Sequence, residues 1–168
     1  MERSEAADFT SLERIALDRL ESPAVKRGAA YWNSLRGQRR FPAYEDIHPR
    51  DFAAILPNTL LVKVLDGGND YEARIVGELQ TQSYALPFSR KRLSEMEATS
   101  PVYCFSLKGL FTHIVEFREP VAVRGQLAPE FPNVTFGYFE SLFLPLGAND
   151  DTVDYLLGFS VYGIRRAG

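Results

Sequence analysis

The feature that most constrains the fold is a sharp turn between two apolar segments. Residues 66–70 read Asp-Gly-Gly-Asn-Asp, a composition typical of a tight turn. The run before it, residues 60–65, is almost continuously apolar, as in a strand buried on both faces. In the run after it, residues 71–76, apolar and polar side chains alternate. Strands joined by so short a turn run antiparallel, so the sequence predicts a β-hairpin.

One long helix and three strands are expected after the hairpin. Short helices are predicted over residues 78–84 and near Leu93, and the long helix runs from Pro101 to about Phe117. Strands are predicted over residues 121–125, 135–146 and 154–162. This order, β-β-α-β-β-β, is typical of an α+β fold, a five-stranded antiparallel sheet with its helices gathered on one side.

The N-terminal part of the chain carries helix signals. Thr10 and Glu13 have the spacing of a capping box, and Ser22 precedes a proline at the first position of a helix. We therefore expect two helices, or one kinked helix, over residues 10–36. The chain divides accordingly into a helical extension, residues 1–40, that caps the sheet or dimerises, and a main domain, residues 41–168.

Composition excludes several classes of protein. The 168 residues, 45% of them hydrophobic, suffice for one domain with its own core. A single cysteine, Cys104, excludes an internal disulfide and a cysteine-rich metal site. The net charge of −3 argues against a nucleic-acid partner. Residues 1–7 lack the apolar stretch of a secretory signal, and no segment reaches the ~20 apolar residues of a membrane span, so we expect a cytoplasmic protein with no membrane partner.

A set of short motifs is spread over residues 25–163. In chain order they are Tyr31-Trp32 with Leu35-Arg36-Gly37, Phe41-Pro42-Ala43, Asp46-Ile47 with Pro49, Leu56-Pro57, Arg74-Ile75-Val76-Gly77, Glu119-Pro120-Val121 and Leu144-Pro145-Leu146. Their order and spacing resemble a family of short, single-domain bacterial PAS-like proteins of the PAS domain superfamily. The resemblance implies a PAS-like fold and a sensory or regulatory signalling protein, not an enzyme, acting through a partner protein or as a homodimer. The chain departs from the family's pattern at residues 85–91, where the family's Gly-rich stretch is missing.

The resemblance also implies a small-molecule pocket, because the PAS sheet curls around short helices and leaves an apolar cavity. The candidate lining is Tyr71, Arg74, Val76, Leu79, Tyr84, Tyr103, Leu107, His113, Phe136, Tyr138, Glu140 and Leu157. Tyrosines supply both apolar surface and a polar anchor for a ligand. The alternative is that these aromatic side chains only fill the core.

Two titratable residues stand out by their positions. Glu140 shares a predicted strand face with apolar residues, so it needs a buried partner, for which Arg74 is the candidate, unless its carboxylate reaches solvent. His113 lies beside the apolar face of the long helix. It is either a satisfied histidine at the edge of the core or a ligand for haem iron or an anion.

Three functional hypotheses follow. The first is a PAS-like regulatory module that binds a partner protein and a small ligand. The second is a small α+β enzyme with a cone-shaped pocket, in which Glu140 or His113 is the general base and a tyrosine stabilises the oxyanion. The third is a haem or flavin sensor. Because no catalytic motif or metal-ligand spacing occurs, we predict no catalytic residues, no metal site and no required cofactor, with Cys104 a small buried apolar residue.

The predicted N-terminal helices offer a candidate interface. Their apolar residues are expected to cover the outer face of the sheet and to support a symmetric dimer. The candidate interface residues are Ile15, Leu20, Val25 and Trp32 from the helices, with Phe139 and Phe143 from the long strand.

Overall fold

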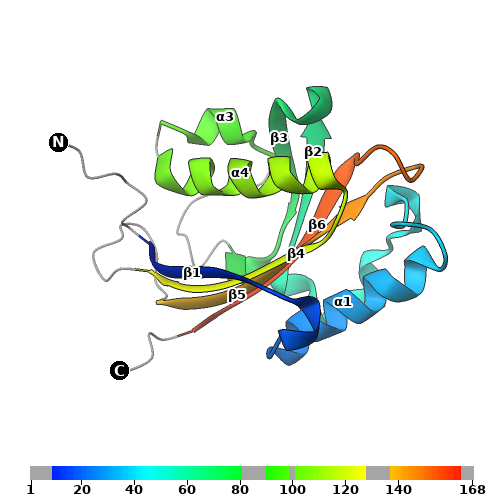
Figure 1. Ribbon diagram of the computed structural model, residues 1–168, viewed down its shortest axis with the longest axis horizontal. Coiled ribbons are helices and arrows are strands. Elements are labelled where there is room, and N and C mark those ends of the chain that lie inside the picture. The colour runs from blue at the N-terminus through cyan, green and yellow to red at the C-terminus, as the bar shows by residue number, and fades with distance from the viewer. Residues whose placement is uncertain (1–8, 81–89, 99–100, 128–136, 164–168) are drawn as a thin grey trace.

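A computed structural model describes residues 9–80, 90–98, 101–127 and 137–163 of the chain. It contains one six-stranded antiparallel sheet with the strand order β1-β4-β5-β6-β2-β3 (Figure 1). The strands are β1 Phe9–Ile15, β2 Thr59–Leu65, β3 Asp70–Val76, β4 Val121–Leu127, β5 Tyr138–Leu146 and β6 Tyr155–Gly163. The α+β class and the PAS-like architecture expected from the sequence are confirmed, with one strand more than the predicted five.

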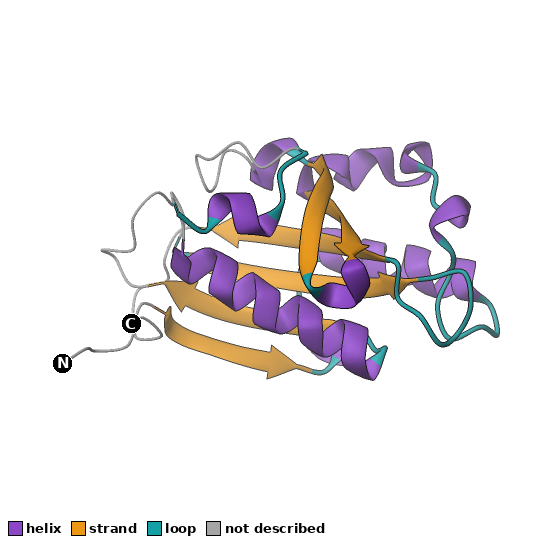
Figure 2. Ribbon diagram, turned by 90° about the horizontal axis from the view of Figure 1, so that it is seen from above, coloured by secondary structure: helices purple, strands orange, loops and turns teal. Residues whose placement is uncertain are grey.

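Helices cover both faces of this sheet (Figures 1 and 2). α1, Pro23–Arg36, packs on β5 and β6 from one side. α4, Pro101–Phe117, lies on the opposite side together with the short α3, Leu93–Met96, which packs on β3 and α4. We call these two sides of the sheet the α1 face and the α4 face. A 3-10 segment, Pro49–Asn58, leads from α1 into β2.

The first part of the helical region predicted over residues 10–36 is wrong, because residues 9–15 form the edge strand β1. β1 pairs antiparallel with β4, with Leu12 opposite Gly125 and Ile15 opposite Ala122. Local capping signals favour a helix at this place, but pairing with a neighbouring strand supplies the backbone hydrogen bonds instead. The first residues described are therefore part of the sheet and not part of a helical extension.

α1 begins where the sequence predicted a helix. The Ser22 side chain accepts a hydrogen bond from the Val25 N–H at 3.4 Å, and Pro23 occupies the first helical position. Gly28 brings the helix close to the sheet, because a Cβ at this residue would lie 2.3 Å from the Phe159 ring. The Trp32 indole N–H donates to the Pro145 carbonyl at 2.8 Å, which fixes the far end of α1 on β5.

The predicted hairpin forms as β2 and β3. Leu65 lies opposite Asp70, and the register shifts by one residue between Leu61 and Val62, a β-bulge. The turn uses left-handed backbone at Asp66, Gly67 and Gly68. The composition of residues 66–70 thus predicted the hairpin correctly.

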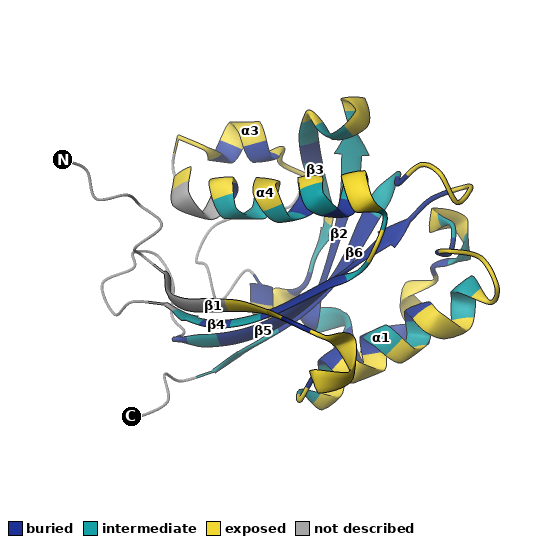
Figure 3. Ribbon diagram, viewed as in Figure 1, coloured by how far each residue is buried: buried dark blue, intermediate teal, exposed yellow. Residues whose placement is uncertain are grey.

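The two faces of β5 are the reverse of what the sequence predicted. The Phe143 ring lies 5.5 Å from the ring of Phe111 on α4, so Phe143 and its alternating neighbour Phe139 face α4. Glu140 and Leu142 project to the α1 face instead. The centre of β5 is buried on both sides (Figure 3), and a strand with two apolar faces carries no signal of which helix covers which face.

Candidate functional site

A small apolar cavity lies on the α4 face between β2, β3, α3 and α4. Its volume is about 20 Å³. The lining consists of Leu60, Val62, Tyr71, Ala73, Lys91, Leu93, Met96, Leu107 and Phe111. The Tyr71 ring packs against Phe111 at 5.2 Å, and its hydroxyl lies 3.2 Å from the Thr112 hydroxyl. Tyr71 is therefore held by α4 from both ends of its side chain.

The structure brings only part of the predicted pocket to this cavity. Tyr71 and Leu107 belong to the lining. Val76 is partly buried and Leu79 is exposed, and neither is in contact with the cavity. Tyr84 and Phe136 lie outside the described residues, as does the side chain of Tyr103.

The other predicted pocket residues lie elsewhere in the fold. Glu140 and Leu157 project to the α1 face, and strand alternation puts Tyr138 on the same face. Arg74 is exposed on β3, where its Nε donates to Glu72 at 2.5 Å. The predicted Arg74–Glu140 pair is therefore wrong.

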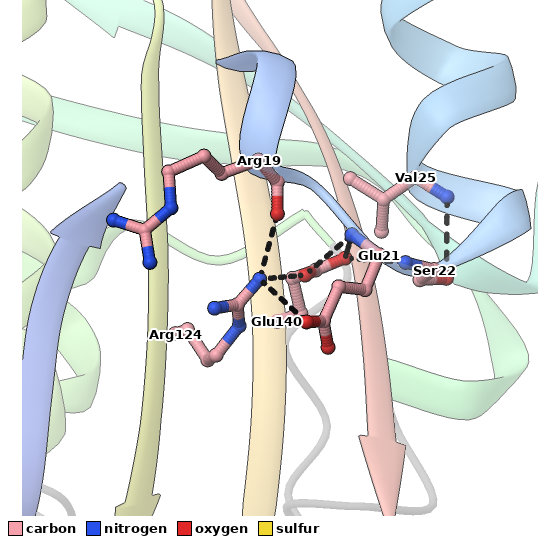
Figure 4. A network of polar contacts seen from close by, with 6 residues as sticks. All are labelled: Arg19, Glu21, Ser22, Val25, Arg124 and Glu140. Carbon is pink, nitrogen blue, oxygen red and sulfur yellow. Dashed lines mark hydrogen bonds and ion pairs between the residues drawn. The ribbon is translucent and has the colours of Figure 1, made fainter. Parts of the chain in front are cut away.

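Glu140 is instead the centre of a polar junction between the sheet and the start of α1 (Figure 4). Its side chain is 1% exposed and accepts from the backbone N–H groups of Glu21 at 3.0 Å and Ser22 at 2.9 Å. Arg124, directly opposite on β4, donates to it at 3.0 Å and to the Arg19 carbonyl at 2.8 Å. The carboxylate thus joins two strands to the segment that leads into the helix.

The electrostatics of this junction favour the charged form of Glu140. Burial raises the pKa of Glu140, but hydrogen bonds from the backbone of Ser22 and Glu21 and from the Arg124 guanidinium outweigh it, and the net pKa is lowered. The carboxylate oxygens are occupied and the proton affinity is reduced. This environment opposes the role of general base that the enzyme hypothesis gave to Glu140.

Arg124 is a residue of this junction that was not predicted from the sequence, although the sequence carries a signal for it. Residue 124 lies in a predicted strand, and alternation along that strand puts its side chain on the face opposite Val123. An arginine on a strand next to a buried glutamate is a natural candidate partner. The register between β4 and β5, which aligns Arg124 with Glu140, comes only from the tertiary structure.

His113 belongs to a surface cluster that ties β1 to α4. Arg14 donates from Nη1 to His113 Nε2 at 3.1 Å and from Nη2 to Glu119 at 3.0 Å. The hydrogen bond from Arg14 lowers the pKa of Glu119. With its ring nitrogen bound to Arg14 and its ring packed on Phe117 at 4.6 Å, His113 fits the role of a satisfied histidine at the edge of the core.

The predicted interface residues are all buried within one protomer. Ile15, Leu20, Val25 and Trp32 are covered on the α1 face, and Phe139 and Phe143 on the α4 face. They belong to a single apolar core of the described chain. The expected helix cover of the sheet is therefore present, made by α1, but these residues leave no free surface for a second chain.

Cys104 lies in the core on the inner side of α4. It is 1% exposed, and burial together with Glu97 raises the pKa of its thiol to about 11. Such a thiol is a poor nucleophile near neutral pH. Among the described residues, no group of three or more His, Cys, Asp or Glu side chains is placed to hold a metal ion.

One antiparallel sheet with helices on both faces and an apolar cavity under a long helix defines an α+β domain. A sequence model described as a PAS domain matches residues 20–161, most of the chain, and the chain therefore belongs to the PAS domain family. PAS domains are typically sensory and non-enzymatic modules. No curated protein and no solved structure matches the sequence. Among the described residues, no helix is long and apolar enough to cross a membrane.

Proposed function

We propose that this chain is a regulatory module that works by contacting another protein, in the first place a second copy of itself. The observation that carries the proposal is the apolar surface on the solvent side of α4. Phe105 is 83% exposed and Phe117 is 51% exposed, although large apolar side chains elsewhere in the described chain are mostly buried. Exposed aromatic side chains on one helix are typical of a contact surface.

The charges on α4 favour a second copy as the partner. Lys108 and Glu116 are both exposed on this helix, and neither has an ion-pair partner among the described residues. Two α4 helices packed antiparallel about an axis near Thr112 would place Lys108 opposite Glu116 of the partner subunit. Phe105 lies on the same side of α4 as Thr112, two turns earlier, so it would enter this contact. A two-fold interface requires this kind of self-complementarity.

A regulatory function also agrees with the environment of the residues considered for catalysis. Glu140 is locked between Arg124 and the backbone of α1, and His113 is bound to Arg14 at the surface. Neither lines the apolar cavity. A small ligand in that cavity would act by changing the position of α3 or α4, and through α4 the protein contact.

Native mass spectrometry over a range of protein concentrations tests the dimer. We expect Phe105→Ser to raise the dissociation constant at least about tenfold, the loss typical of a buried aromatic anchor. Leu17→Ser is the matched control, because Leu17 is an exposed apolar residue outside α4, and this change should have no effect.

A charge exchange makes the test specific for the antiparallel pairing. Lys108→Glu should weaken the dimer by setting two acidic groups against each other, and the double variant Lys108→Glu/Glu116→Lys should restore it. A wild-type protein that is monomeric at every concentration, or a Lys108→Glu variant that dimerises as well as the wild type, would show that α4 is not the interface.

A further inference from the structure

The cavity on the α4 face has one charged residue in an otherwise apolar lining. Leu60, Val62 and Ala73 form its floor on β2 and β3, and Leu107 and Phe111 cover it from α4. Lys91 is the one charged residue among the described residues that line it. Lys91 is exposed, so the cavity approaches solvent beside this residue, and a long lysine side chain can keep its charged end in water there.

The Lys91 ammonium group has no hydrogen-bond or ion-pair partner within the described ranges, although its backbone carbonyl accepts from Ala73 N–H at 3.0 Å. Acidic side chains nearby are engaged with other groups. Asp70 accepts from the Ser94 hydroxyl at 2.6 Å, and Glu72 binds the Arg74 Nε at 2.5 Å. Glu95 accepts from the Arg92 backbone N–H at 2.8 Å. Within the described ranges, Lys91 is thus a cation beside the cavity that makes no direct ion pair.

The size of the cavity limits the apolar part of a ligand. A water molecule requires about 10–15 Å³ by the same measure. The cavity of about 20 Å³ therefore takes one or two carbon-sized groups. An ethyl group fits this space, and the third carbon of an isopropyl group requires Met96 on α3, a flexible side chain, to move slightly.

We propose that this cavity binds a short-chain aliphatic monocarboxylate, with its hydrocarbon end between β2, β3 and α4 and its carboxylate beside Lys91. The inference rests on the proposed regulatory function, because the ligand would be the signal that the module reports. A dicarboxylate would place a second charge in the apolar lining, which costs free energy. A neutral alcohol or amide would leave the ammonium group of Lys91 without its counter-charge.

The ligand class is tested with isobutyrate and its neutral isostere isobutyramide, each titrated into the full-length ¹⁵N-labelled protein and followed by chemical-shift changes. We expect isobutyrate to bind about threefold to fivefold more tightly than the amide, the gain typical of a solvent-exposed ion pair. The shift changes should centre on β2, β3, α3 and the middle of α4. Equal binding of the two compounds, or shift changes elsewhere, would overturn the proposal, as would no binding of either compound.

Two variants of Lys91 and one control variant of Arg90 locate the bound carboxylate. Lys91→Met keeps the aliphatic stem and removes the charge, so it should lose the preference for isobutyrate over isobutyramide. Lys91→Arg should keep that preference. Arg90→Met is the matched control, because Arg90 is an exposed cation on the same segment that does not line the cavity. If Arg90→Met and Lys91→Met lose the preference for isobutyrate equally, the preference comes from general electrostatic attraction to the positive surface, and the site is rejected.

Filling the cavity tests its apolar half. Ala73→Val adds methyl groups to the floor and should abolish binding of isobutyrate and isobutyramide alike, with the fold checked by the thermal unfolding midpoint. Binding to Ala73→Val at the wild-type affinity would reject the cavity as the site. Ligand binding and oligomeric state are measured independently. A monomeric protein that binds isobutyrate would reject the α4 dimer and support the ligand. A dimeric protein that binds neither compound would support the dimer and reject the ligand.

Discussion

The two faces of the sheet are held to their helices by different chemistry. On the α1 face, a buried charge network joins Glu140 and Arg124 to the backbone of Glu21 and Ser22. On the α4 face, the buried contacts are mainly aromatic and aliphatic, the charged groups of Arg14, His113 and Glu119 lie at the surface, and a small cavity remains next to Tyr71 and Phe111. Hydrogen-bonded charges fix one geometry, whereas apolar contacts tolerate small shifts. This difference favours the α4 face as the side that would respond in the proposed regulatory function.

The largest expected effect comes from removing one member of the buried pair. Arg124→Ala leaves the charge of Glu140 buried without its ion-pair partner and should lower the free energy of unfolding by about 3–5 kcal/mol, measured by urea denaturation. Arg74→Ala is the control. Arg74 is exposed and pairs with Glu72 at the surface, so its loss should be within about 0.5 kcal/mol.

The double variant Arg124→Met/Glu140→Leu sharpens this result. It removes both charges and should recover part of the stability lost in Arg124→Ala, but not all of it, because two backbone N–H groups lose their acceptor at about 1 kcal/mol each. Equal losses in the single and double variants would mean that the junction is held by packing, as the α4 face is.

Two helical glycines on opposite sides of the sheet provide the next comparison. Gly28→Ala should destabilise the fold by about 1–3 kcal/mol, because the new methyl group overlaps the Phe159 ring. Gly109→Ala on α4 meets nothing within 4 Å and should stabilise by up to about 1 kcal/mol through helix propensity. Thermal unfolding of dilute protein measures both. Stabilisation by Gly28→Ala would show that α1 can move away from the sheet.

As the pH falls, the polar contacts of Glu140 on the α1 face should be lost before the apolar contacts on the α4 face. The pKa of Glu140 in the folded protein is lowered from its ordinary value of 4.5, because hydrogen bonds to its charged form outweigh the effect of burial. A lowered folded-state pKa gives stability that is fully present above the ordinary value and is lost as the pH falls through the folded-state value. The free energy of unfolding should therefore fall more steeply below pH 4.5 in the wild type than in Arg124→Met/Glu140→Leu.

A second acidic residue with a lowered pKa serves as the control for this pH dependence. Glu119 is exposed, and Arg14 lowers its pKa at the surface. Glu119→Gln should leave most of the steep acid dependence in place. If this variant flattens the curve as much as the double variant does, the surface cluster and not the buried junction governs acid stability.

The smallest effect concerns the thiol of the α4 face. Burial raises the pKa of Cys104 to about 11, so the thiolate is scarce near pH 8 and shielded from solvent. An aromatic disulfide such as dithiobis(nitrobenzoate) should label the native protein slowly and the urea-unfolded protein fast, measured by the absorbance of the released thiolate. Labelling at equal rates would mean that α4 opens readily from the sheet.

Much of the fold was predictable from the sequence because local signals and tertiary structure agree there. The residues 66–70 determine a turn whatever surrounds it, and Ser22 with Pro23 begins a helix by local hydrogen bonding and a fixed backbone angle. The long α4 follows from its apolar face. The strand β1 could not be predicted in this way, because its partner β4 lies more than a hundred residues later in the chain.

The site was less predictable than the fold. Both faces of β5 are apolar, so the pattern could not tell that Phe143 faces α4 and Glu140 faces α1. The partner of Glu140 depends on the register of β4 against β5, and Lys91 comes to the cavity through backbone bonds to Ala73. These are long-range pairings, and no local pattern encodes them.

The sequence by itself determined the α+β class, the hairpin of β2 and β3, and α1 and α4 as helices, because turn composition, capping residues and apolar periodicity act over a few neighbouring residues. The tertiary structure alone decided the sixth strand, the assignment of the two sheet faces, the Arg124–Glu140 pair and the position of Lys91 beside the apolar cavity. Each of these depends on strand register and on which helix covers which face, and both are set by the burial of the whole chain at once.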